Sequence, residues 1–174
     1  MTTKMFFNLL ANGKKDILQN FLDLLEEMKI NYCVIGGIGV NAYSEPVVSL
    51  DLDLVIAVEI IEKLKNKLKN QFSIKKFPHS LNLKSPHSDL RIQIQTDPRY
   101  QQFISQAKTM QVMGYEMKVA ALEDILKGKV WAYLDNQRRQ SKRQKDLADI
   151  FRLVEAHPHL NNLLPNSIKG MIGD

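Results

Sequence analysis

The sequence is poor in cysteine and in long apolar runs. Its 174 residues include one cysteine, Cys33, which excludes an internal disulfide and a thiolate metal site and is typical of a reducing compartment. No apolar run reaches the roughly 18 residues that a membrane-spanning helix needs. The short apolar patch at the N-terminus has no small-residue cleavage pattern after it, so we interpret it as the start of a helix and not as a signal peptide. We therefore expect a cytoplasmic protein without a membrane partner.

Histidines at metal-binding spacing are also lacking. The four histidines are His79, His87, His157 and His159. None of them has the i, i+4 spacing of a helical zinc pair. The sequence therefore favours no histidine metal site.

What is present is an ordinary globular composition with a local excess of positive charge. Hydrophobic residues make up 44% and charged residues 25%, and the formal net charge is +5. At this length we expect one domain, residues 1–174. One segment, 136–145, carries five cations and no acid, namely Arg138, Arg139, Lys142, Arg143 and Lys145. Such a cluster suits phosphate groups, RNA included, although a solvated helix face gives the same pattern.

The hydrophobic periodicity predicts a small α/β (α+β) fold, with a mixed sheet, flanking helices and a helical C-terminal part. The expected sheet-containing core is about 15–120 and the helical part about 121–160. Helices are expected over 6–28, 38–45, 59–72, 98–109, 121–137 and 141–157. Strands are expected over 32–37, 49–58, 73–77, 81–85 and 89–96, with a hairpin around Gly114. The order is not a regular βαβ array, and so a doubly wound dinucleotide fold is not favoured.

Two neighbouring features suggest a site for a metal and a nucleotide. Gly36 and Gly37 end one predicted strand, where bare backbone amides can approach a phosphate. Asp51 and Asp53 lie one residue apart on the next strand, so alternation puts both on the same face. Two adjacent carboxylates repel each other unless a cation lies between them, and Mg²⁺ or Mn²⁺ bound to a triphosphate would supply that cation.

The pattern Ile35-Gly36-Gly37, a gap of thirteen residues, then Asp51-Leu52-Asp53-Leu54 resembles the motif of the DNA polymerase β-like nucleotidyltransferase superfamily. The C-terminal part is similar to bacterial nucleotidyltransferases of the abortive-infection, AbiEii-like type. The matching residues there are Glu123-Asp124, Lys129, Arg138-Arg139, and Lys145-Asp146 with Asp149. The resemblance covers roughly residues 15–155.

The resemblance implies a metal-dependent transferase that uses an NTP such as ATP. It implies that Asp51 and Asp53 hold the metal, and that a nucleotide site includes Gly36, Gly37, Ser49, Lys129 and Asp146. It also implies a toxin–antitoxin setting with a partner antitoxin protein. From the residues alone, Lys129 could neutralise triphosphate charge or be solvated. Asp146 could hold a lysine or a base edge, or simply pair on its own helix.

The same superfamily places a third carboxylate on a later strand. In the matching strand of this sequence, that position is Gln93, whose amide can ligate a metal weakly but cannot act as a base. Asp89 shares the face but lies four residues earlier, about 13 Å along a strand. A further departure is Val47, where many relatives carry arginine.

Three functions remain open at this point. The first is transfer of an NMP from an NTP to a hydroxyl of RNA, such as a tRNA end, or of a protein side chain. The second is a degenerate nucleotidyltransferase fold that binds a nucleotide, RNA or a partner without turnover, which Gln93 favours. The third is a glycosyltransferase that uses the two aspartates for a sugar nucleotide, in which the glycine pair would have no role.

Overall fold

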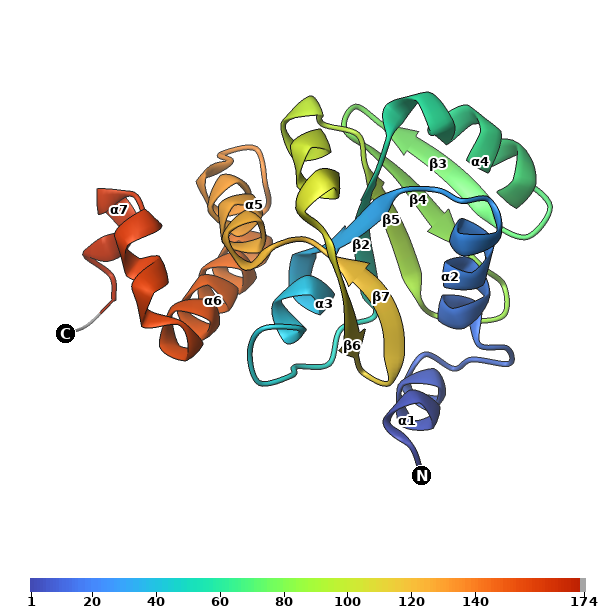
Figure 1. Cartoon of the computed structure of the whole chain (residues 1–174), viewed down its shortest axis with the longest axis horizontal. Helices are drawn as coiled ribbons and strands as arrows, with labels where there is room; N and C mark the ends of the chain where they lie inside the picture. The colour runs from blue at the N-terminus through green and yellow to red at the C-terminus, as the bar shows by residue number, and fades with distance from the viewer. Residues whose placement is uncertain (173–174) are drawn as a thin grey trace.

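A mixed seven-stranded sheet forms the centre of the computed structural model, which describes residues 1–172 (Figure 1). The strands are β1 (Tyr32–Ile35), β2 (Asp51–Ile56), β3 (Ser73–Phe77), β4 (Ser80–Lys84), β5 (Arg91–Gln95), β6 (Lys108–Val112) and β7 (Tyr115–Val119). Their order across the sheet is β3-β4-β5-β2-β1-β7-β6. The pairs β2–β5 and β1–β7 are parallel and the others antiparallel. The predicted mixed sheet and α+β class are confirmed.

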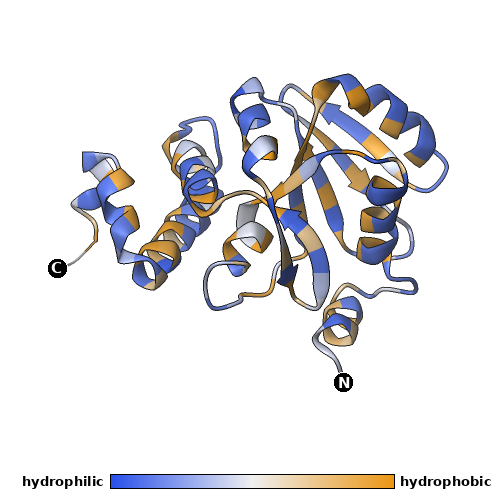
Figure 2. Ribbon diagram, in the orientation of Figure 1, coloured by the Kyte–Doolittle hydropathy of each residue, from blue (hydrophilic) through white to orange (hydrophobic). Residues whose placement is uncertain are grey.

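Two helices cover one face of the sheet, α2 (Ile17–Glu27) and α4 (Ile61–Leu68), with the one-turn 3₁₀ helix η1 (Val58–Ile60) just before α4. α2 has an apolar stripe at helical spacing, and its buried residues are Ile17, Leu18, Phe21, Leu22 and Leu25. Figure 2 shows hydrophobic colour along the central strands and mostly hydrophilic colour on α4. Burial of these apolar side chains against the sheet forms the core.

The remaining helices of the C-terminal part pack near α3 (Gly36–Asn41), which contacts β1, β2 and the two long helices that follow the sheet. These are α5 (Leu122–Leu134) and α6 (Gln140–Ala156), which pack on each other, followed by η3 (Pro158–Leu163) and the short α7 (Asn166–Lys169). Figure 1 shows α5, α6 and α7 gathered beyond one end of the sheet. No helix in residues 1–172 is long and apolar enough to cross a membrane.

The prediction of one helix over 6–28 is wrong, because the segment forms α1 (Thr3–Leu10) and α2 with a turn between them. Asn12 adopts a left-handed backbone conformation (φ 47°), which ends a helix. Its side-chain amide donates to the Asp89 carboxylate at 2.6 Å. Asp16 then caps α2 by accepting a hydrogen bond from the Gln19 amide at 3.0 Å.

Most other expected elements are present with shorter bounds. The hairpin around Gly114 forms as β6 and β7, and Gly114 takes a positive φ of 83° at the turn. The expected helix over 98–109 is a 3₁₀ helix, η2 (Pro98–Gln106). The strand expected to begin at Asp89 begins at Arg91, which removes Asp89 from the ladder.

Candidate active site

β2 presents two carboxylates on one face of the sheet. Asp51 and Asp53 both line a cleft, whereas Leu52 and Leu54 on the opposite face are fully buried. β2 pairs with β1 on one side, where Ile35 is opposite Asp53, and with β5 on the other. Strand alternation therefore places both aspartates toward the cleft, as the sequence predicts.

Gly36 connects β1 to α3 directly beside Asp53. Its φ is +67°, a conformation that favours glycine. A Cβ atom built at this position would lie 2.2 Å from Asp53 Oδ2, so any side chain would displace the carboxylate. A Cβ at Gly37 would instead meet Ser49 Oγ at 3.7 Å, an ordinary contact. The first glycine is thus required by both backbone and space, and both line the cleft.

The Asp53 carboxylate has no protein partner in the part of the chain that the structure describes, neither a hydrogen bond nor an ion pair. Burial raises the pKa of Asp53 to about 6; Lys129 acts in the opposite direction and the charge of Asp51 adds to the increase. Asp53 is half-buried and lines the cleft, so its carboxylate is open to a solute in the cleft. Two carboxylates on one face, one of them unpartnered, suit a hard divalent cation, which prefers oxygen ligands.

Asp51 differs from Asp53 because it is already paired. Arg91 Nε donates to Asp51 Oδ1 at 2.6 Å, and Lys142 Nζ lies 3.8 Å from Asp51 Oδ2. Arg91 lies opposite Asp51 in the β2–β5 ladder. The Asp51 backbone amide donates to Ser49 Oγ at 3.3 Å, which holds the predicted serine next to the aspartate.

The register between β2 and β5 shows which residue lies where the superfamily has its third carboxylate. Gln93 lies directly opposite Asp53 and lines the cleft. Asp89 lies before β5, accepts the hydrogen bond from Asn12 and is not among the residues that line the cleft. Within residues 1–172 no group of three or more His, Cys, Asp or Glu side chains is arranged to hold a metal. The structure therefore brings Gln93, and not Asp89, to the two aspartates.

A buried ion cluster from α5 and α6 forms another wall of the cleft. Lys129 Nζ lies 3.1 Å from Asp146 Oδ1 and 2.7 Å from Asp149 Oδ2. Arg138 Nε donates to Asp146 Oδ2 at 2.6 Å. Burial lowers the pKa of Lys129, but the Asp149 and Asp146 carboxylates outweigh this effect and the pKa lies above its usual value. Of the interpretations that the sequence left open, Lys129 is buried and not solvated, and Asp146 holds a lysine.

The cleft has a volume of about 710 Å³ and a cationic lining. The eight lysines and arginines that line it are Lys84, Arg91, Lys129, Arg138, Arg139, Lys142, Lys145 and Arg152. They face four aspartates, Asp51, Asp53, Asp146 and Asp149. A cationic excess beside a carboxylate pair suits a polyphosphate and its metal.

The basic segment 136–145 contributes to the cleft only in part. Arg143 is turned away from it, because its Nε donates to the Tyr133 carbonyl oxygen at 2.7 Å. Arg91 and Arg152 line the cleft but were not predicted as site residues from the sequence. Arg91 shares a strand face with Gln93, which could have indicated it, whereas Arg152 reaches Asn41 Oδ1 at 2.9 Å through tertiary packing alone.

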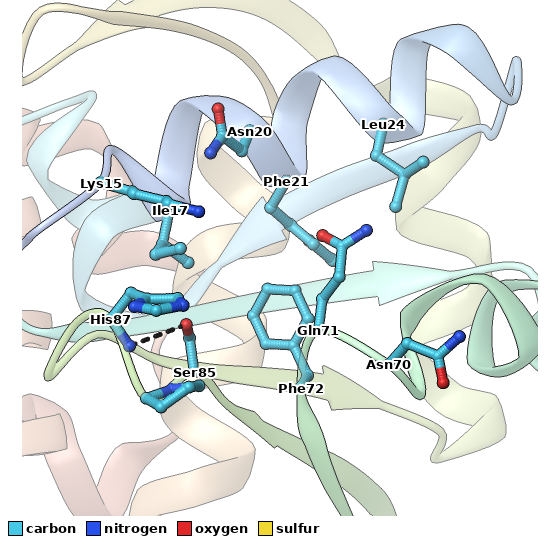
Figure 3. A pocket seen from close by; sticks show the side chains of 11 residues that line it. Lys15, Ile17, Asn20, Phe21, Leu24, Asn70, Gln71, Phe72, Ser85 and His87 are labelled. Atoms are coloured by element: carbon cyan, nitrogen blue, oxygen red, sulfur yellow. Dashed lines mark hydrogen bonds between the residues drawn. The ribbon is translucent and has the colours of Figure 1, made fainter.

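A second pocket lies elsewhere and lacks carboxylates. Its volume is about 320 Å³, and Figure 3 shows its lining from α2 and from the segments after α4 and β4. His87 lies here, and its backbone amide donates to Ser85 Oγ at 3.1 Å. His157 contacts the Tyr43 carbonyl oxygen at 2.7 Å with Nε2. Neither histidine lines the cleft that contains Asp51 and Asp53.

Residues 34–170 match the model of a protein family described as nucleotidyl transferase AbiEii toxin, type IV TA system. The chain belongs to the AbiEii nucleotidyltransferase family. The matched range starts in β1 and contains every residue that lines the larger cleft, so the aspartates, the glycine pair and the buried ion cluster are part of the AbiEii match. A search of curated protein sequences finds no match.

Solved nucleotidyltransferase structures share the fold of this AbiEii family member. The solution structure of the antibiotic-resistance factor ANT(2'')-Ia has a TM-score of 0.61 at 12% identity and covers 88% of each chain. The lincomycin-bound lincosamide adenylyltransferase LnuA has a TM-score of 0.56 at 16% identity, over 82% of this chain and 99% of that one. An antigenic nucleotidyltransferase-like protein from Paracoccidioides brasiliensis has a TM-score of 0.55 at 18% identity, over 94% and 84%. At these identities the similarity establishes the fold.

Proposed function

We propose that this chain transfers a nucleoside monophosphate from an NTP to a hydroxyl acceptor, with Mg²⁺ or Mn²⁺ held by Asp51 and Asp53. The observation that carries the proposal is a pair of carboxylates on one strand face that line a cation-lined cleft, one of them without a partner in residues 1–172. Membership of a nucleotidyltransferase family supports the same reaction.

The residues of the chain have distinct roles in this proposal. Gly36 and Gly37 have no side chains, so phosphate oxygens can approach the backbone, and Ser49 offers a hydroxyl beside them. The bound cation would neutralise charge on the triphosphate and orient its α-phosphorus. Asp51 and Asp53 orient the cation, and the cationic lining stabilises the charge of the departing pyrophosphate.

Lys129 and Asp146 complete the nucleotide site from the helical part. Lys129 is paired with Asp146 and Asp149 at the cleft wall. It would contribute a fixed positive charge to the nucleotide site, and it holds the Asp146 carboxylate in place. Residues 1–174 then act as one domain. Its core, about 15–120, supplies the two metal-binding aspartates, and its C-terminal part, about 121–160, supplies most of the cations of the cleft.

The acceptor that fits the charge of the cleft best is RNA. Arg139, Lys142 and Lys145 line the cleft at and after the start of α6, and Lys142 Nζ lies 3.8 Å from Asp51 Oδ2. A polyanion gains from such a cationic lining. A tRNA end has the hydroxyl that the reaction needs, and a protein side chain is the other acceptor to test. The family description supports a toxin role with a partner antitoxin protein.

A degenerate site that binds a nucleotide without turnover is the second candidate. The observation that favours it is the neutral Gln93 opposite Asp53, together with Arg91 on Asp51. Gln93 cannot accept a proton from an attacking hydroxyl. Of the facing residues of β2 and β5, the two aspartates would have to fulfil that role.

Label transfer separates the two functions. The purified chain is incubated with each α-³²P-labelled NTP, with Mg²⁺ or Mn²⁺, and with total RNA or lysate protein. The matched control is the Asp51→Ala/Asp53→Ala variant. A labelled RNA or protein band that the double variant does not produce supports the transferase and names the acceptor class.

Two other results would contradict the transferase. If no label is transferred, but the wild type binds NTP in a Mg²⁺-dependent manner that the double variant loses, the chain is a nucleotide-binding protein. If neither label transfer nor binding occurs, the metal–nucleotide interpretation of the two aspartates is wrong.

A further inference from the structure

We propose that Arg91 takes the place of a second divalent cation beside Asp51, so that the site binds one metal ion per chain. The inference rests on the proposed function and specifies its metal site. Arg91 is thereby a positioning residue, because it acts by occupying and orienting the Asp51 carboxylate. Sites that catalyse phosphoryl or nucleotidyl transfer with two metals hold the ions about 3.5–4 Å apart between shared carboxylates.

Ligand occupancy is the first argument. Arg91 Nε is 2.6 Å from Asp51 Oδ1, a short charge-assisted hydrogen bond. Lys142 Nζ lies 3.8 Å from the other carboxylate oxygen. Both oxygens of Asp51 thus already face a cation of the protein, whereas Asp53 has no partner in residues 1–172.

The β2–β5 register is the second argument. The ladder places Arg91 opposite Asp51 and Gln93 opposite Asp53. β5 lies between β4 and β2 in the sheet, so its backbone cannot slide to bring another residue to the aspartates. Opposite the two aspartates, β5 therefore offers one cation and one neutral amide, and no carboxylate of β5 lines the cleft.

Charge balance is the third argument. Two divalent cations bring four positive charges, and such ions are held by several carboxylates. Here two aspartates bring two negative charges, and one of them is compensated by Arg91. The cleft lining as a whole has eight lysines and arginines against four aspartates. A triphosphate with one divalent cation keeps a net negative charge that this lining can balance, whereas a triphosphate with two divalent cations keeps none. The protein ligands available to a single ion are Asp53, the Gln93 side-chain carbonyl oxygen and Asp51 Oδ2, which lies 3.8 Å from the partly exposed Lys142 Nζ, whereas Arg91 holds Asp51 Oδ1.

Counting bound Mn²⁺ by electron paramagnetic resonance tests the inference without turnover. The wild type is titrated with Mn²⁺ in the presence of a saturating α,β-methylene NTP analogue, and each variant is titrated in the same way. The variant that should create a second metal site is Arg91→Gln/Gln93→Asp. The matched control is Arg99→Gln, because the Arg99 side chain is 57% exposed like that of Arg91 and also pairs with an aspartate, but it does not line the cleft.

The expected counts are one Mn²⁺ for the wild type, one for Arg99→Gln and two for the double variant. Two Mn²⁺ on the wild type would overturn the inference and leave the proposed function intact. No Mn²⁺ on the wild type would overturn both. One Mn²⁺ on a double variant with a native circular dichroism spectrum would show that Arg91 and Gln93 do not limit the count. The wild-type count is decisive even if the double variant does not fold.

Discussion

The Asp53 carboxyl group combines a raised pKa with the absence of a protein partner in the described residues. Its pKa of about 6 lies above the value of about 4 for an exposed aspartate. The unfolded chain therefore releases this proton at lower pH than the folded one. Stability from this group is present below about pH 4 and is lost as the pH rises toward 6.

Asp53→Asn should consequently stabilise the metal-free protein above pH 6, by about 1–3 kcal/mol. Urea denaturation at pH 8 and pH 4, with EDTA present, measures this. The gain should shrink at pH 4, where the wild-type carboxyl is neutral. The matched control, Asp51→Asn, removes a partner of Arg91 and should give no gain. An Asp53→Asn variant that is less stable than the wild type at pH 8 would contradict the account.

Removal of the buried Lys129 should cost substantial stability. Its side chain is 10% exposed and pairs with two aspartates that are 2% and 15% exposed. Lys129→Met would remove the cation that the two carboxylates share and leave Asp146 with Arg138 and Asp149 with Arg152. Loss of one partner from a buried ion pair typically costs about 3–5 kcal/mol, and the remaining arginines should keep the loss near the lower end of that range. Urea denaturation should show this loss. Lys127→Met, which removes an exposed i, i+3 pair on the same helix, should change stability by less than about 1 kcal/mol. Equal effects of the two substitutions would contradict the buried-cluster account.

At the scale of elements, the β1–α3–β2 unit depends on the turn at Gly36. Gly36→Ala combines a strained positive φ with a Cβ that would lie 2.2 Å from Asp53 Oδ2, so we expect a loss of about 1–3 kcal/mol. It should also weaken Mn²⁺ binding, because Asp53 must move. Gly37→Ala is the matched control, since its Cβ makes only an ordinary contact. Thermal unfolding and Mn²⁺ titration of both variants test this. A Gly36→Ala variant with wild-type stability and metal affinity would show that the turn does not set the position of Asp53.

The elements that the sequence predicted best are those with local signals. β1, α3 and β2 follow from an apolar run, two glycines and a strand that alternates over Asp51–Leu54 before it becomes wholly apolar. The position of Asp51 and Asp53 on one face needs only that alternation. The break between α1 and α2 was missed although residues 12–16 are polar and include Gly13 and the N-cap Asp16, because the apolar residues on either side of them were assigned to one helical stripe. The left-handed Asn12 is stabilised by Asp89, a contact between distant segments.

Pairings across elements could not be predicted in the same way. The contact between Arg91 and Asp51 depends on the register of two strands that are distant in sequence. The burial of Lys129 depends on α5 packing against α6, which brings Asp146 and Asp149 to it. Sequence periodicity indicates which face of each helix is buried, but not what that face packs against. The sequence therefore did not decide whether the Lys129 side chain is solvated or faces a phosphate.

At the scale of the whole molecule, the charge of the cleft should govern nucleotide affinity. The net charge is +5, and cations outnumber acids in the cleft lining. Raising NaCl from 50 to 300 mM should weaken NTP binding roughly five- to tenfold, because salt screens partly exposed charges. Binding of the corresponding nucleoside, measured by calorimetry, should change little. A salt-independent NTP affinity would mean that the cationic lining does not contact the phosphates.

The central claim is that Asp51 and Asp53 direct transfer of the α-phosphoryl group, and a paired-label experiment tests it most directly. The same NTP is supplied with ³²P at either the α or the γ position, together with Mg²⁺ and RNA or protein acceptors. The account predicts that the α label enters an acceptor, that the γ label leaves as pyrophosphate, and that Asp51→Ala/Asp53→Ala abolishes both. Transfer of the γ label to an acceptor, or α-label transfer that survives in the double variant, would contradict it.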